Sequence, residues 1–103
     1  MKLLQKQKKE KVNNRPNYIP LKRIKIVHRP LGREAAYAQV YKEDDNYIIE
    51  IDDRQTEKEL LGSYCHELFH GMLPDLSESD ILKMEKTIGN YLWSLGYRRV
   101  NLK

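Results

Sequence analysis

The strongest structural signal in the sequence is a helix that begins directly after Thr56. Thr56 and Glu59 form the T-x-x-E pattern of a capping box, in which each side chain satisfies a free backbone N–H group at the helix start. No proline follows until Pro74, and Gly71 and Pro74 are typical stop signals. The run also carries an apolar stripe at helical spacing, formed by Leu61, Cys65, Leu68 and Met72. An amphipathic helix is therefore expected from Glu57 to about Gly71.

This expected helix carries the sequence His66-Glu67-Leu68-Phe69-His70, which is an H-E-x-x-H motif. Since residues four apart lie on one face of a helix, His66 and His70 can offer two imidazole nitrogens to a single metal ion. Both histidines point well away from the apolar stripe, so the helix can pack against a core and bind a metal on a separate face. Glu67 lies beside the first ligand, where it can reach a metal-activated water as a general base. The motif predicts a hydrolytic zinc centre.

A second helix is expected from Ser77 to about Leu95. Ser77 and Asp80 form an S-x-x-D capping pair, and Gly96 suits the backbone that closes a helix. The apolar stripe of this helix is formed by Ile81, Ile88, Leu92 and Leu95.

Two carboxylates, Glu78 and Glu85, fall on the stripe of the second helix. A carboxylate that faces a core costs free energy unless it is paired or bound to a metal. Glu78 lies in the first turn, eight residues after His70, and is the preferred third metal ligand. Glu85 lies about two turns further along, and Asp75 lies in the loop between the helices. Both remain alternatives for the third ligand.

Three strands are expected before the helices, over residues 22–28, 36–41 and 47–52. The first and third contain β-branched apolar residues bounded by turn signals at residues 30–32 and 43–46. Because the connections are short, an antiparallel meander is favoured. The sequence therefore predicts an α+β fold, in which a small three-stranded, mostly antiparallel sheet packs on two consecutive helices.

The length of 103 residues is enough for one small domain with a modest core. The sequence has no apolar run of transmembrane length and no apolar signal-peptide region, so no membrane contact is expected. The single cysteine, Cys65, excludes an internal disulfide and lies on the apolar stripe, where packing is its expected role. A cytoplasmic location is the simplest expectation.

Residues 1–14 are rich in lysine and poor in apolar side chains, so a flexible basic arm is expected there. Residues 15–20 contain two prolines and read as a linker, which gives an arm and linker over 1–20 and a domain over 21–103. The arm supplies most of the net charge of +4. Weak nucleic-acid contact through phosphates is one role for it, and a solubilising tail is the other.

Four segments together resemble a family of small zincin-type metallopeptidase domains found in phages and mobile elements, which is distantly similar to the ImmA/IrrE and SprT-like groups. The segments are residues 51–54, the HELFH helix, residues 74–78 and residues 92–98. The chain lacks the long spacing to the third ligand of the ImmA/IrrE group and the downstream histidine of the SprT-like group.

The resemblance implies a compact sheet packed on two helices, with one zinc ion per chain held by His66, His70 and a downstream acid. It implies that Glu67 is the catalytic base and that the substrate is a peptide or a protein. In such folds the edge strand beside the motif helix aligns an extended peptide through backbone hydrogen bonds. Here that strand would be residues 47–52 or its neighbour.

Further residues are candidates for supporting roles in such a site. Tyr64, Tyr97 and Arg98 are possible donors to the oxyanion that develops during hydrolysis. Asp52 or Asp53 could orient a ligating histidine through its second ring nitrogen.

A zinc-stabilised binding or regulatory module without catalysis is the alternative interpretation. Such a module would need His66 and His70 but would not need Glu67, so the presence of Glu67 favours the peptidase. The module could associate with nucleic acid through the basic arm.

Overall fold

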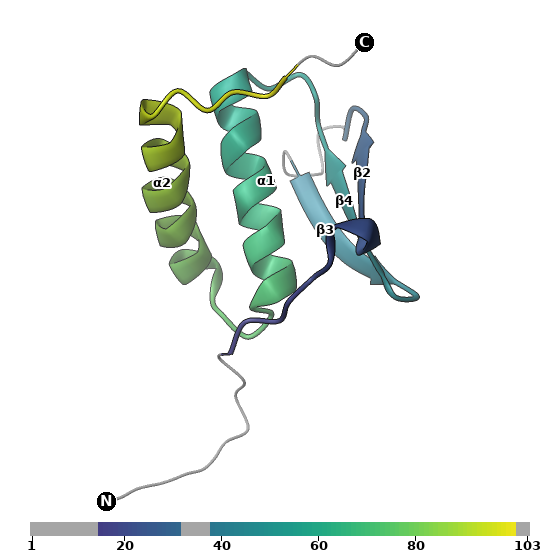
Figure 1. The fold of residues 1–103 in the computed structure, drawn as a ribbon. Coiled ribbons are helices and arrows are strands. Elements are labelled where there is room, and N and C mark those ends of the chain that lie inside the picture. The colour runs from purple at the N-terminus through teal and green to yellow at the C-terminus, as the bar shows by residue number, and fades with distance from the viewer. Residues whose placement is uncertain (1–14, 32–37, 101–103) are drawn as a thin grey trace, which may run out of the picture.

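The computed structural model describes residues 15–31 and 38–100, so the predicted basic arm over residues 1–14 lies outside the described residues. In chain order the elements are the 3-10 turn η2 (Leu21–Arg23), the strands β2 (Ile24–His28), β3 (Ala38–Glu43) and β4 (Asn46–Ile51), and the helices α1 (Glu57–Met72) and α2 (Glu78–Ser94). They form three layers, with α1 between the sheet and α2 (Figure 1). The predicted α+β architecture is confirmed. None of the helices in the described part of the chain is long and apolar enough to cross a membrane.

The sheet is mixed, and the predicted meander is wrong. β4 is the central strand: β3 pairs with it antiparallel, and β2 pairs with it parallel. His28 and Ala38 both lie opposite Ile51, so β2 and β3 occupy opposite sides of β4 although they are consecutive strands. The physical reason is burial, because β4 is the most buried strand and Ile49 and Ile51 in its second half are completely buried.

Both helices begin and end as the sequence predicts. The Thr56 hydroxyl accepts a hydrogen bond from the backbone N–H of Glu59, and the Glu59 carboxylate accepts one from the N–H of Thr56, which completes the capping box of α1. The Ser77 hydroxyl caps α2 by accepting from the N–H of Asp80. Gly96 follows α2 with φ +94°, a left-handed conformation that suits glycine.

The core lies between the sheet and α1. Its buried residues are Ala38, Ile49, Ile51 and Leu60, and Ile24, Val40, Tyr64 and Leu68 pack against them. The predicted apolar stripe of α1 is therefore only partly right, because Leu60 and Glu67 are the buried positions of this helix. The cause is that α1 has neighbours on two sides, the sheet and α2, so its burial is not confined to one stripe.

The apolar stripe of α2 is only partly covered. Ile81 is completely buried, but Ile88 and Leu95 are 39% and 56% exposed, which corrects their predicted place in the core. Within the described residues α2 packs mainly on α1, which covers only part of its apolar stripe.

Candidate metal centre

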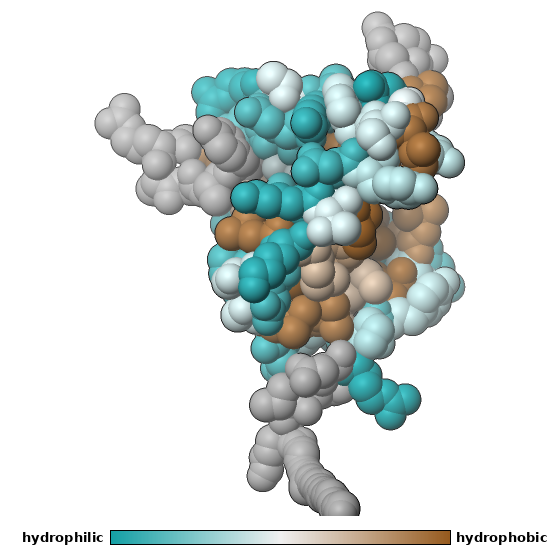
Figure 2. Space-filling model, turned by 90° about the vertical axis from the view of Figure 1, so that its left-hand side faces the viewer, coloured by the Kyte–Doolittle hydropathy of each residue, from teal (hydrophilic) through white to brown (hydrophobic). Residues whose placement is uncertain are grey.

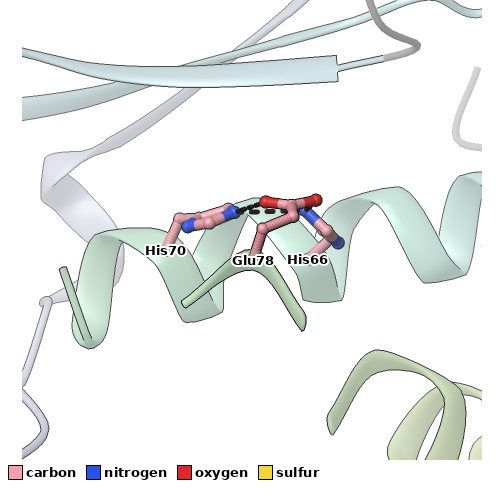
Figure 3. Close-up of side chains that lie close together, drawn as sticks. All are labelled: His66, His70 and Glu78. Atoms are coloured by element: carbon pink, nitrogen blue, oxygen red, sulfur yellow. Dashed lines mark hydrogen bonds and ion pairs between the residues drawn. The ribbon is translucent and has the colours of Figure 1, made fainter. Parts of the chain in front are cut away.

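Three side chains from the two helices converge at one point (Figure 3). The Nε2 atoms of His66 and His70 lie 3.2 Å apart on α1. The Glu78 carboxylate lies against both rings, with Oε1 2.7 Å from Nε2 of His70 and Oε2 2.9 Å from Nε2 of His66. One ligand atom from each of the three residues falls within 4.8 Å of the others, a spacing that a single metal ion could bridge. These are the three predicted metal ligands.

The short connection between the helices produces this convergence. Leu73 closes α1 by donating its N–H to the carbonyl of Phe69, and Leu76 then donates to the carbonyl of Leu73. The chain reverses within residues 73–77, so the first turn of α2 lies beside the last turns of α1. Glu78 is the first residue of α2, which places its side chain over the histidine face of α1.

Glu85 lies on the other side of the His66 ring, with its Oε1 2.8 Å from Nδ1 of His66. A carboxylate only accepts, and carboxylates lie against both ring nitrogens of His66, so either nitrogen can donate when no metal is bound. A metal ion at Nε2 would leave the proton of a neutral His66 on Nδ1, where Glu85 accepts it. Glu85 therefore orients a predicted ligand, a role that the sequence prediction gave to Asp52 or Asp53. Asp75, the other alternative third ligand, is not part of the cluster.

Two glycines allow Glu85 to lie this close to α1. A Cβ atom at Gly62 would lie only 2.7 Å from Oε2 of Glu85. A Cβ at Gly89, on the facing helix, would lie 3.9 Å from the Cα of Gly62. The helices thus approach each other closely at this crossing, and a side chain on α1 here would occupy the space of the Glu85 carboxylate.

Glu67 is buried beside the cluster, with 6% of its surface exposed. Together with His66 and Glu78 it lines a cavity of about 260 Å³, and Ala38 of β3 and Leu82 of α2 form other parts of the wall. None of the described residues donates a hydrogen bond to the Glu67 carboxylate, although a carboxylate in a buried position usually has such a donor. Glu67 is thus a buried carboxylate in the wall of a small open cavity beside the cluster.

Burial raises the pKa of Glu67 above the ordinary value of 4.5, because its charged form loses hydration. The nearby His66 and His70 oppose this change, while Glu78 and Glu85 add to it. A carboxylate with a raised pKa is a stronger base than an exposed one.

The donor set of the cluster suits a divalent cation. Imidazole and carboxylate are zinc ligands, and two ligands of a tetrahedral zinc ion lie about 3.3 Å apart, close to the 3.2 Å between the two Nε2 atoms. The Glu78 oxygens lie nearer to the rings, at the hydrogen-bond distances of 2.7 and 2.9 Å, so Glu78 would move slightly outwards to share an ion with them. The three residue types suit zinc.

Asp52 serves the fold and not the cluster. Its buried carboxylate accepts hydrogen bonds from the backbone N–H of Leu31 at 3.3 Å and of Arg54 at 3.1 Å, and it pairs with the Arg54 guanidinium at 2.7 Å. These bonds, those from Arg54 above all, hold the pKa of Asp52 far below its ordinary range. Asp52 thus fixes the chain between β4 and α1, and Asp53 is exposed.

The three candidate oxyanion donors lie elsewhere. The Tyr64 hydroxyl lies 2.7 Å from Nε2 of His28 on β2. Tyr97 and Arg98 line a second cavity of about 240 Å³ near the first turn of α1, where Arg98 stacks 3.3 Å from the centre of the Trp93 ring. Arg98 also donates to the carbonyls of Trp93 and Tyr97. The structure does not bring these donors to the cluster.

The edge strand beside the cluster is β3. The predicted strand at 47–52 corresponds to β4, which is central and has a neighbour on each side. Its neighbour β3 pairs only with β4 within the described residues, and its first residue, Ala38, lines the cavity with Glu67. Of the two strands that the resemblance left open, 47–52 is central, and its neighbour β3 is an edge strand within the described residues.

Comparisons with known proteins add no relative to this picture. No protein-family model, curated protein sequence or solved structure matches the chain. The resemblance to small zincin-type domains thus remains a prediction from motifs, and the geometry of the cluster carries the functional argument.

Proposed function

We propose that this protein is a zinc-dependent metallopeptidase. The observation that carries the proposal is the convergence of His66, His70 and Glu78 beside the buried carboxylate of Glu67. Two nitrogen ligands, one oxygen ligand and an adjacent base form the minimal set for metal-assisted hydrolysis.

His66 and His70 would hold the ion through their Nε2 atoms, and Glu78 through its carboxylate. Bound there, zinc would supply Lewis acidity, which lowers the pKa of a water molecule and polarises a carbonyl group. Glu85 keeps the Nδ1 proton of His66 in place, so the Nε2 lone pair remains directed at the ligand position.

Glu67 is the proposed general base. It takes a proton from the attacking water and passes it to the nitrogen of the leaving amine. Its burial raises its pKa, which prepares it to hold that proton between the two steps. A module that used zinc only for stability would gain nothing from a buried carboxylate without a hydrogen-bond donor, so Glu67 favours catalysis over the purely structural alternative.

A peptide substrate is proposed because β3 is an edge strand within the described residues and its first residue, Ala38, lies in the cavity wall. Backbone groups of an edge strand can pair with an extended peptide and hold it in register. Since Ala38 lies at the cavity wall with Glu67, a peptide added along β3 would pass close to the base.

A proteome-derived peptide library tests the proposal without knowledge of the substrate. The zinc-loaded protein is incubated with the library, and new amino termini are identified by mass spectrometry. Cleavages that are present with the wild type, absent with Glu67→Gln and absent after chelation are expected. Cleavage by Glu67→Gln at the wild-type rate would show that the base is assigned wrongly. An uncleaved library with a zinc-loaded protein would favour the non-catalytic module.

A further inference from the structure

The second cavity, of about 240 Å³, lies near the start of α1, whereas the metal cluster lies near the end of that helix. The chain that follows α2 runs across the start of α1 and forms part of the cavity wall (Figure 1). The wall combines apolar and charged side chains, among them Leu61, Trp93, Tyr97, Glu57, Arg98 and Arg99. Apolar walls with a few placed polar groups are the usual form of a small-molecule site.

Contacts within the chain hold the Arg98 guanidinium in place. Its Nη1 atom donates to the carbonyl of Trp93 at 3.0 Å and to the carbonyl of Tyr97 at 2.9 Å, so both Nη1 protons are used. One face of the guanidinium stacks on the Trp93 ring, with Cζ 3.3 Å from the ring centre. A side chain that is fixed before the ligand arrives loses less entropy when it binds.

The other edge of this guanidinium has no partner within the described residues. The internal contacts use Nη1 and one face of the group, and none of the described residues accepts a hydrogen bond from Nε or Nη2. The Nε and Nη2 protons form a fork that matches the two oxygens of a carboxylate. Arg98 can therefore bind one carboxylate through two parallel hydrogen bonds.

The charges around the cavity favour a ligand with a single negative charge. Arg99 is already paired, because its Nη2 atom lies 2.7 Å from Oε2 of Glu57. Within the described part of the lining, Arg98 is therefore the charge that remains to be paired. A neutral ligand would leave this cation unmatched, and a doubly charged phosphate would bring a second negative charge near Glu57.

The apolar part of the wall indicates the rest of the ligand. Leu61, Trp93 and Tyr97 offer apolar surface, against which a hydrocarbon or aromatic group gains free energy by leaving water. Apolar surface also lies on the outer side of α2, between hydrophilic bands (Figure 2). The cavity differs from that surface because apolar walls and a fixed cation occur together in it.

We propose that the second cavity binds a small apolar carboxylic acid in its ionised form. The carboxylate pairs with Nε and Nη2 of Arg98, and the apolar body lies against Leu61 and Tyr97. A free acid has this chemistry, and so does the C-terminal residue of a peptide when its side chain is apolar. The site is separate from the metal cluster, so the proposal does not depend on zinc or on peptidase activity.

Trp93 is the only tryptophan of the chain, so its fluorescence reports directly on the cavity. The full chain is titrated with hydrocinnamate, a carboxylate with a phenyl body, in the presence of a chelator. A saturable change with a dissociation constant of about 1 mM is expected for a ligand of this size. The neutral amide of the same acid, and inorganic phosphate, should each bind about tenfold more weakly. The acid and its amide are compared on the wild type, so this result does not depend on the folding of a variant.

Arg98→Lys tests the assigned residue. Lysine keeps the charge but lacks the fork of two parallel donors, so hydrocinnamate should bind about tenfold more weakly. Arg23→Lys makes the same change where the arginine pairs with the exposed Asp45, and should bind like the wild type. Circular dichroism checks that both variants are folded.

N-acetylphenylalanine separates the two sources of the acid, because it adds the amide group of a peptide to the body of hydrocinnamate. Tighter binding than that of hydrocinnamate would identify the C-terminal residue of a peptide as the ligand, and weaker binding would identify a free acid. The proposal would be overturned by a wild type that shows no saturable change with hydrocinnamate. Equal binding of the amide or of phosphate, or undiminished binding by Arg98→Lys, would overturn it as well.

Discussion

The Oε1 atom of Glu85 lies 2.8 Å from Nδ1 of His66, on the side of the ring opposite Glu78. The His66 imidazole is thus held between two carboxylates from one helix, seven residues apart in α2. With a metal ion at Nε2, the Nδ1 proton of His66 would be accepted by Glu85. Glu85 is therefore part of the proposed metal site beside its three ligands.

Removal of Glu85 should weaken zinc binding without abolishing it. Glu85→Ala leaves the three ligands in place but frees the His66 ring to rotate, so zinc affinity is expected to fall about 10- to 100-fold. Competition with a chromophoric chelator measures this affinity. Glu43→Gln, an exposed acid at the end of β3, is the control and should bind zinc like the wild type. Unchanged affinity in Glu85→Ala would show that the hydrogen bond to His66 does not hold the ligand.

Gly62→Ala should act on zinc through Glu85. The new methyl group would lie 2.7 Å from Oε2 of Glu85, so the flexible end of that side chain must shift, which disturbs the bond of its Oε1 to His66. Zinc affinity is expected to fall, by no more than in Glu85→Ala. Gly89→Ala is the matched control, because its methyl group would meet only the Cα of Gly62 at an ordinary 3.9 Å.

The two substitutions should not be additive. In a Glu85→Ala background the methyl group of Gly62→Ala has no carboxylate to displace, so the second substitution should change zinc affinity little. Additive losses in the double variant would mean that Gly62 acts by separating the helices and not through Glu85.

The helices and the ligand cluster could be predicted from the sequence because they depend on local rules. The capping residues Thr56 and Ser77 define the helix starts, and four-residue spacing places His66 and His70 together. A short connection then brings Glu78 to them. Each of these inferences needs only neighbours in the sequence.

The remaining features depend on contacts between distant segments. The parallel pairing of β2 with β4 joins residues more than twenty positions apart, which no local pattern encodes. The role of Glu85 depends on how closely α1 and α2 approach each other at Gly62. In the sequence, Glu85 is visible only as a carboxylate on an apolar stripe. The exposure of Ile88 and Leu95 likewise reflects which neighbour covers α2, and periodicity alone does not contain that information.

Glu67→Gln should stabilise the metal-free protein. The buried Glu67 carboxylate loses its hydration on folding, and none of the described residues donates a hydrogen bond to it. The amide of glutamine carries no charge and loses less, so a gain of about 1 kcal/mol in unfolding free energy is expected at neutral pH. Urea unfolding in the presence of a chelator measures it, with Glu43→Gln as control.

The pH dependence of that gain follows from the raised pKa of Glu67. Below the ordinary value of 4.5 the carboxyl group is neutral in both folded and unfolded chains, so the variant gains nothing. As pH rises through the raised pKa of the folded protein, the wild type loses stability and the advantage of Glu67→Gln grows. A variant that is less stable than the wild type at neutral pH would contradict the burial argument.

Asp52 should support the fold with the opposite pH dependence. Its pKa is lowered by Arg54 and the backbone, so it stabilises the folded state above the ordinary value of 3.8 and loses that effect as pH falls towards its lowered pKa. Asp52→Asn should therefore unfold at lower urea concentration at neutral pH, and the deficit should shrink in acid. Asp45→Asn, which loses only an exposed pair with Arg23, should unfold like the wild type at both pH values.

The zinc content of the purified, untagged protein decides whether the cluster is a metal site. Elemental mass spectrometry should find about one zinc per chain in the wild type and in the control Asp75→Ala, and almost none in His70→Ala and Glu78→Ala. Zinc that persists in Glu78→Ala would mean that another residue is the third ligand. A wild type that binds no zinc when zinc is supplied would contradict the metal site and, with it, the proposed peptidase.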